Sequence, residues 1–384
     1  MKKIKRILAL VLAVIFVVGM LTACGGGKDK QGGGKDDGKI HIGLMHFTWT
    51  SRISTSLLDY CNNYLAPNFN VEFTTYTCGF DNDSCISTVE NMITAGEDGL
   101  ILLVSSGITE IDKICHENGV PFALIQGKPT DAEEAKLMEN ASEEFICCIA
   151  PSENPADGGI IEAEAMLAQG LTKCAIVSTP MGMIEAGDQE DAGFIKAFTE
   201  GGGTIVDEKR EIPGDPMITA ADTVIATHGD EIDFLYGLLD VLQSIVTDPK
   251  YAEKNLKIVS NELPSDGGVA LFEKGILAFC LEKDPQQVGL ALAGIINYLN
   301  GDQYKDAPAY RKVISPYTQI HNAEECKMFL KVADGKEGCD PLWNVDEIKS
   351  LILAENPSAT FADFCKLAAS TQVDEICERH GITK

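Results

Sequence analysis

The chain lacks the short motifs that mark the common enzyme classes. It contains no GxxxxGK[ST], no GxSxG, no HExxH and no GxGxxG directly after a predicted strand. Only six histidines occur in 384 residues, and they form no local metal or nucleophile set. The Asp81-Asn82-Asp83 stretch begins like a calcium loop but lacks the required glycine and closing glutamate. We therefore expect no enzymatic activity, no cofactor and no metal site.

Positive charge is also scarce, since the chain contains 31 Lys and Arg but 58 Asp and Glu, which gives a formal net charge of −27. Nucleic acid is excluded as a partner, because its phosphates would be repelled. No CxxC occurs, and no Cys/His spacing fits structural zinc, although the chain has 13 cysteines. Two alternatives stay open for them: bridges such as Cys78–Cys85 and Cys326–Cys339, or free thiols buried as small apolar residues.

The N-terminus has the layout of a secretory signal. Four basic residues within 2–6 precede an uncharged run over 7–20, and small residues follow directly before Cys24. The Leu21-Thr22-Ala23-Cys24 sequence resembles the bacterial lipoprotein box, which implies a signal peptide over 1–23 and a lipid anchor on Cys24. The alternative is an uncleaved membrane helix. Either interpretation places the rest of the chain outside the cytoplasm.

Residues 24–38 are predicted to be a flexible tether. Half of the residues in 25–38 are glycine and the others are polar, so the segment buries too little surface to order itself. A folded part on such a tether stays near the membrane and turns freely.

From residue 39 onward, hydrophobic periodicity alternates between strand and helix. Strands are predicted at 40–45, 71–77, 100–104, 120–125, 173–178, 204–211, 223–227, 256–260 and 276–281. Helices are predicted at 51–64, 84–95, 108–118, 155–169, 185–200, from 228 through 246, 322–332, 345–354 and 361–369. This alternation is typical of the α/β class, with parallel sheets covered by helices on both faces. Because it occurs in two blocks, it indicates two lobes of the same kind.

Several stretches resemble the type I periplasmic binding proteins, the sugar-binding branch of the solute receptors for ABC importers. They are IHIGLMHFTW, TVENMITAGEDGLILLVSSG, ICHENGVPFALIQG, NPADGGIIEAEAML and EKGILAFCLEKDPQQVGLALAGIINYLNG. The resemblance implies two doubly wound parallel-sheet lobes joined by a three-strand hinge. The first lobe would comprise 39–150 plus 285–312, and the second 151–284. Residues 313–384 would hold the last hinge crossing and a helical C-terminal extension.

The resemblance also implies a function: a monomeric, lipid-anchored receptor on the extracytoplasmic face of the cell membrane. It would deliver a small polar solute, a sugar or a polyol, to an ABC permease by hinge closure. A ligand sensor for a membrane kinase or chemoreceptor, and a receptor for a nucleoside or quorum signal, remain alternatives with the same fold.

Ligands of open α/β sheets bind beyond the carboxyl ends of the strands. The candidates at such ends are His46, Phe47, Trp49, Asp81, Ser105, Gln126, Asn154, Asn261 and Glu262. Core packing is the alternative role for Phe47 and Trp49, and a solvated turn is the alternative for Asp81.

The resemblance adds two further ligand-binding candidates. It places Glu190 and Lys283 where relatives usually carry an arginine and a glutamine, and Glu262 where they carry a ligand-binding aspartate. The loss of arginine points to an acidic pocket, suited to a neutral polyol or a cation-bearing solute.

Overall fold

The computed structural model describes residues 37–382 apart from 238–247, 249–253, 261–266 and 334–340. In this part of the chain the strands form two six-stranded sheets, A and B. Sheet A contains, in spatial order, β11 (Lys312–Ile314), β5 (Phe145–Ala150), β4 (Phe122–Ile125), β3 (Gly99–Leu102), β1 (Ile40–His46) and β2 (Val71–Thr77). All its neighbouring strands are parallel, so their carboxyl ends meet at one edge.

Sheet B repeats this arrangement later in the chain. Its spatial order is β12 (Thr318–Ile320), β10 (Leu277–Glu282), β9 (Lys257–Ser260), β8 (Phe234–Gly237), β6 (Lys173–Ser178) and β7 (Thr204–Arg210). The pairs are parallel except β10–β12, which is antiparallel. The α/β class with two parallel-dominated sheets, predicted from the periodicity, is confirmed.

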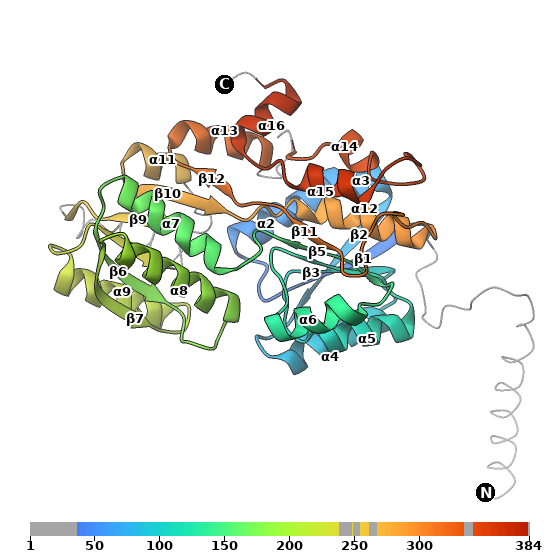
Figure 1. Cartoon of the computed structure of the whole chain (residues 1–384), viewed down its shortest axis with the longest axis horizontal. Coiled ribbons are helices and arrows are strands. Elements are labelled where there is room, and N and C mark those ends of the chain that lie inside the picture. Colours follow the sequence, from blue (N-terminus) through green and yellow to red (C-terminus); the bar gives the residue numbers. More distant parts are fainter. Residues whose placement is uncertain (1–36, 238–247, 249–253, 261–266, 334–340, 383–384) are drawn as a thin grey trace, which may run out of the picture. The chain divides into compact units, whose positions relative to one another are not determined.

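Helices cover both faces of sheet A, because alternate residues of its strands point to opposite sides. Leu100 and Leu102 pack with α4 (Asn82–Thr94), α5 (Ile108–Asn118) and α6 (Asp131–Asn140). Ile101 packs on the other side with α2 (Arg52–Tyr60) and α12 (Gln287–Leu299). The chain continues from α2 through the π-helical turn η1 (Cys61–Leu65) into α3 (Ala66–Phe69). Figure 1 shows α4, α5 and α6 together on one side and α2, α3 and α12 on the other.

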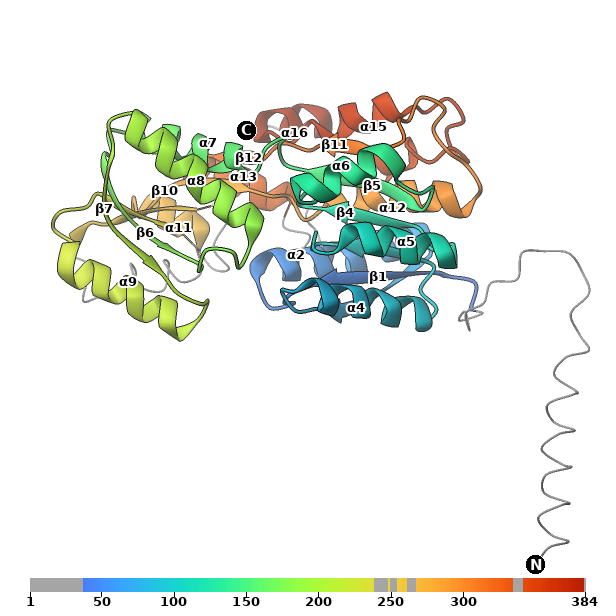
Figure 2. The ribbon, with the colours of Figure 1, turned by 60° about the horizontal axis from the view of Figure 1, so that its bottom comes forward.

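Sheet B is covered in the same way (Figure 2). On one face, α7 (Ala156–Ala168) and α8 (Glu185–Glu200) share a core with β6, β8, β9 and β10. On the other face lie α9 (Asp215–His228) and α11 (Gly268–Glu273). The chain passes between the two sheets after β5, after β10 and between β11 and β12.

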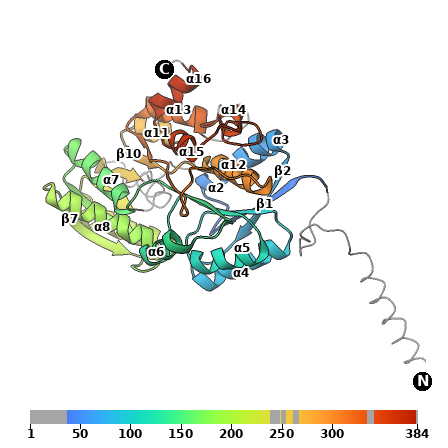
Figure 3. The ribbon, with the colours of Figure 1, turned by 45° about the vertical axis from the view of Figure 1, so that its right-hand side comes forward.

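The residues after 320 form helices that pack against both sheets' helices. These are α13 (Ala323–Ala333), α14 (Val345–Lys349), α15 (Phe361–Ala368) and α16 (Val373–His380), seen beside α11 and α12 in Figure 3. We call residues 323–382 the C-terminal extension. The helix predicted over 345–354 is shorter than expected, because the chain turns after Lys349.

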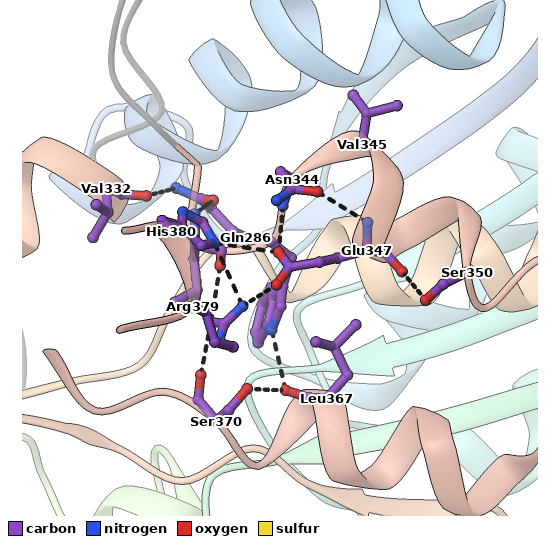
Figure 4. A network of polar contacts seen from close by, with 12 residues as sticks. Gln286, Val332, Asn344, Val345, Glu347, Ser350, Leu367, Ser370, Arg379 and His380 are labelled. Atoms are coloured by element: carbon purple, nitrogen blue, oxygen red, sulfur yellow. Dashed lines mark hydrogen bonds and ion pairs between the residues drawn. The ribbon is translucent and has the colours of Figure 1, made fainter. Parts of the chain in front are cut away.

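Polar contacts tie this extension to the segments that pass between the sheets (Figure 4). Gln286, just after β10, donates from Nε2 to the Val332 carbonyl at 3.3 Å and accepts the Leu342 N–H at 2.7 Å. Thr318 Oγ1 donates to the Thr371 carbonyl at 2.8 Å, and Gln372 Nε2 to the Tyr317 carbonyl at 2.9 Å. The extension therefore contacts two of the three crossings.

One strand prediction in sheet B is wrong. Residues 223–227, predicted as a strand, lie inside α9, and β8 occupies residues predicted as helix. β-Branched residues favour strands, but here helical spacing determines the structure. The buried residues of α9 are Met217, Ala220, Ala221, Val224 and Ile225, which share one helical face.

Of the two alternatives left open for the cysteines, the bridge between Cys78 and Cys85 is not present. Both residues are free, buried thiols joined by a side-chain hydrogen bond. Cys326 is also a buried free thiol, and Cys339, its partner in the bridged alternative, lies outside the described residues. Cys24 and the signal-like segment likewise lie outside them, and no helix in the described part has the length and apolar character to span a membrane.

Candidate functional site

An aromatic cluster lies at the carboxyl edge of sheet A, where β1 ends. Phe47 stacks on Phe80 with ring centroids 4.4 Å apart, and His46 lies 5.8 Å from both Phe47 and Trp49. The Trp49 indole N–H donates to the Tyr76 carbonyl at 3.2 Å, so the ring face rather than the N–H is the part left for a ligand. Phe47 and Trp49 also contact the hydrophobic cores, as the packing alternative expected. Phe80, which sequence reasoning missed, is 47% exposed.

Residues that follow His46 in the chain hold its ring in place through hydrogen bonds. Its Nδ1 lies 2.7 Å from the Thr48 carbonyl and 3.1 Å from Ser54 Oγ, near the start of α2. Burial lowers the His46 pKa, which favours the neutral ring. A neutral imidazole with Nδ1 bonded to a carbonyl leaves Nε2 as a hydrogen-bond acceptor.

Two candidates have local structural roles. Asp81 is the N-cap of α4 and accepts the Ser84 N–H at 2.8 Å. Asn154 precedes α7, where its Oδ1 accepts the Ala156 N–H at 3.1 Å. Ser105 is half-buried between β3 and α5. Ligand binding by these three residues stays a prediction.

Gln126 links the end of β4 to the crossing after β10. Its φ of 64° lies in the left-handed region, which is uncommon outside glycine. Its N–H donates to Gln287 Oε1 at 2.9 Å, and its Nε2 approaches the Lys283 carbonyl at 3.5 Å. The structure therefore brings together Gln126 and Lys283, two of the predicted site residues.

A buried ion pair lies close to the same crossing. Arg52, the first residue of α2, pairs with Glu282, the last residue of β10, and both side chains are buried. Asp284 follows two residues later, fully buried, and accepts the Gln286 N–H at 2.7 Å. Burial raises the pKa of Asp284 to about 7. No local pattern identifies Arg52–Glu282, because 230 positions separate the partners.

A small cavity of about 50 Å³ lies at the carboxyl ends of β6 and β8 in sheet B. Its lining includes the carboxylates of Glu162, Glu190 and Asp191, with Ser178 and Tyr236 from the two strands. Glu190, a predicted site residue, lies 3.5 Å from Lys283 Nζ through its Oε2. Lys283 does not line the cavity and contacts it only through Glu190. We call this cavity the carboxylate pocket.

Close packing of α7 on α8 forms the wall of the carboxylate pocket. A Cβ added at Gly159 would lie 2.0 Å from the Glu190 carbonyl oxygen, and one at Gly193 would lie 2.2 Å from that of Ala156. A Cβ at Gly158 would lie 2.6 Å from Glu190 Oε1. These glycines let the helix backbones touch, and that contact places the Glu162 and Glu190 side chains beside each other.

Glu162 was not among the site residues predicted from the sequence, although its position in a helix gave a signal. It occupies a core position of α7, whose other buried residues are Gly158, Gly159, Ala163 and Met166. A glutamate in an apolar helical stripe needs a partner or a function. Asn261 and Glu262 lie outside the described residues, so their roles stay predictions.

Another cavity lies away from these groups. It has a volume of about 80 Å³ and lies between the C-terminal extension and sheet A, lined by residues such as Ile146, Tyr304 and Phe364. Ile146 belongs to the amino-terminal part of β5, so this cavity is remote from the edge where ligands of such sheets bind. Within the described ranges, no group of three His, Cys, Asp or Glu is arranged to hold a metal ion.

Solved structures with the same fold are solute-binding proteins of ABC transporters. One from Actinobacillus succinogenes with bound D-allose has a TM-score of 0.61 at 16% identity, over 75% of this chain and 99% of that one. One from Bacillus halodurans with bound myo-inositol has a TM-score of 0.58 at 16% identity, over 77% and 98%. The arabinose-binding component from Shewanella sp. ANA-3, bound to L-arabinofuranose, has a TM-score of 0.59 at 17% identity, over 75% and 93%.

These neighbours confirm the two-lobed α/β fold of the type I periplasmic binding proteins, predicted from the sequence resemblance. No protein-family model and no curated protein sequence matches the chain.

Proposed function

We propose that the chain is an extracytoplasmic receptor that binds a small polar solute, a sugar or polyol, and delivers it to an ABC import permease. The supporting observation is the pair of parallel sheets whose carboxyl edges carry the aromatic cluster and the carboxylate pocket. Aromatic faces suit the apolar side of a sugar ring, and carboxylates accept hydrogen bonds from hydroxyl groups. The solved neighbours bind D-allose, myo-inositol and arabinofuranose in the same fold.

In this proposal the solute is bound without chemical change. Binding favours a closed arrangement of two lobes, 39–150 plus 285–312 and 151–284, over an open one, and the permease recognises the closed form. The Gln126–Gln287 and Arg52–Glu282 contacts lie at the crossing where such a hinge would bend.

The proposal also includes anchoring through a lipid on Cys24. Wild-type chain expressed in a bacterium should partition with membranes, and Cys24→Ser should release it. Equal membrane partitioning of both forms would contradict lipid anchoring while leaving solute binding unaffected.

The test of solute binding is a thermal-shift panel of sugars and polyols with residues 25–384, followed by calorimetry on each hit. A solute that binds the native state raises the melting temperature by mass action. Trp49→Ala and Glu262→Ala should each weaken the hit's affinity, whereas Met138→Ala, at an exposed apolar position on α6, should not. A panel without any hit would contradict the proposal. A hit whose affinity is the same in all three variants would contradict the site assignment.

A further inference from the structure

The carboxylate pocket has an excess of hydrogen-bond acceptors. Among the residues that the structure describes, neither carboxylate oxygen of Glu162 makes a hydrogen bond of ordinary geometry, although the Tyr236 hydroxyl lies near enough to favour its ionised form, and Glu190 Oε1 likewise lacks a partner. Both side chains are more than nine-tenths buried, at 1% and 4% exposure, and both line the cavity. Buried carboxylate oxygens without donors are costly, so a donor from a ligand would be strongly favoured.

The neighbouring charges do not satisfy this demand. Asp191 is paired with Arg210, whose Nη1 lies 2.9 Å from Asp191 Oδ2. Lys283 approaches only the other oxygen of Glu190, at 3.5 Å, and also lies 5.7 Å from the centre of the Tyr317 ring. Lys283 does not line the pocket, and its ammonium group contacts Glu190 rather than Glu162.

We propose that the carboxylate pocket binds a primary ammonium group of the solute, so that the transported molecule is an amino sugar or amino polyol. An ammonium group has three donors and no acceptor, which matches three acceptor oxygens without partners. A hydroxyl group supplies one donor and brings acceptor lone pairs of its own. A cavity needs a volume of roughly 10–15 Å³ to hold one water. The carboxylate pocket, at about 50 Å³, therefore has room for an aminomethyl end group. This inference rests on the proposed function, since it names the solute of the same receptor.

A pH dependence follows from the same geometry. Burial raises the pKa of Glu162 well above its usual value, and the charges of Glu190 and Asp191 raise it further, while Lys283 and the Tyr236 hydroxyl oppose the shift. The empty pocket therefore disfavours the ionised form of Glu162, and an entering ammonium favours it. Binding of an amine should release a proton, and its affinity should rise with pH as long as the amine stays protonated.

The experiment compares matched probes on the mature chain by calorimetry. Each amine is paired with its hydroxyl counterpart: D-glucosamine with D-glucose, D-galactosamine with D-galactose, and 1-amino-1-deoxysorbitol with sorbitol. Putrescine tests whether the ammonium suffices without a sugar skeleton, and calcium chloride tests whether a metal ion is the cation. At about pH 6 the amines are protonated, and two buffers of different ionisation enthalpy report the protons released.

We expect at least one amine to bind about tenfold or more tightly than its hydroxyl counterpart, because charge-assisted hydrogen bonds replace neutral ones. Glu162→Gln should abolish this preference and the proton release. Glu164→Gln, at an exposed position of the same helix, should retain both. The wild-type comparison needs no variant, so a folding defect in Glu162→Gln would not affect it.

The outcomes separate this inference from the proposed function. Equal or tighter binding of the neutral sugars would overturn the ammonium site but still support the proposed receptor function. Calcium binding at Glu162 would also overturn the ammonium site. Putrescine as the tightest probe would support the ammonium site and contradict the sugar skeleton. No binding by any probe would count against both.

Discussion

The contact between α7 and α8 allows a matched test on a single helix. Gly193 and Gly187 both lie in α8, and alanine raises helix stability by up to about 1 kcal/mol relative to glycine. At Gly187 the nearest heavy atoms, on Ile184, would be 3.7 Å from the new Cβ, which is ordinary contact. At Gly193 the new Cβ would lie 2.2 Å from the Ala156 carbonyl oxygen. Only Gly193→Ala should force the helices apart.

The size of the effect follows from that distance. Since real Cβ contacts essentially never fall below 3.0 Å, α7 and α8 would have to separate by about 1 Å at this point. A gap of about 0.5–1 Å already removes a quarter to a half of the dispersion energy of the facing atoms, and overpacking typically costs about 1–3 kcal/mol. We therefore expect Gly193→Ala to lower the free energy of unfolding by about 1–3 kcal/mol. Gly187→Ala should leave it unchanged or raise it by up to about 1 kcal/mol.

Urea unfolding followed by circular dichroism measures both variants, with equal m values as the check on two-state behaviour. Equal stabilisation by both substitutions would refute the close approach of α7 and α8. It would also remove the argument that this packing places Glu162 and Glu190 together.

Three further predictions concern the segments between the sheets and the extension. Because the folded-state pKa of Asp284, about 7, lies above its ordinary value of 3.8, its contribution to stability is present below that ordinary value and lost as pH rises toward 7. Asp284→Asn should therefore show a smaller loss of stability between about pH 4 and about pH 7 in urea titrations, and an unchanged loss would contradict the raised pKa. Trp343→Ala should lower the free energy of unfolding by about 3–5 kcal/mol, since the side chain is fully buried and its indole N–H donates to the Leu367 carbonyl. A loss as small as that of an exposed substitution such as Met138→Ala would disprove its packing role. Arg52→Met should lower the free energy of unfolding by about 3–5 kcal/mol, because it removes the partner of the buried Glu282 carboxylate. Adding Glu282→Leu should recover most of that loss. Additive losses of unfolding free energy in the double variant would argue against the ion pair.

Much of the fold was predictable because the hydrophobic periodicity of the sequence agrees with the observed burial along most of the described chain. Residues 173–178 and 185–200 match β6 and α8 in full, since an apolar run and an amphipathic stripe each dictate one structure. The prediction failed at 223–227, where β-branched residues concealed a helix that begins at Asp215-Pro216. Pro at the start of a helix was the available signal there.

The candidate site was predictable where it follows strand ends and not where it depends on packing. His46 ends β1, and Phe47 and Gln126 come directly after strands, so their positions followed from the sheet. Glu162 lies in the middle of a helix, and its contact with Glu190 depends on glycines that let two backbones approach. Such tertiary proximity leaves little trace in a local sequence pattern.

The central claim is that a bound solute closes two lobes, and small-angle scattering tests it most directly. The mature chain should be measured alone and with the solute that raises its melting temperature most, at a concentration that saturates it. We predict a smaller radius of gyration in the bound sample, with the same molecular mass. Identical scattering curves for the free and the saturated protein would contradict the account.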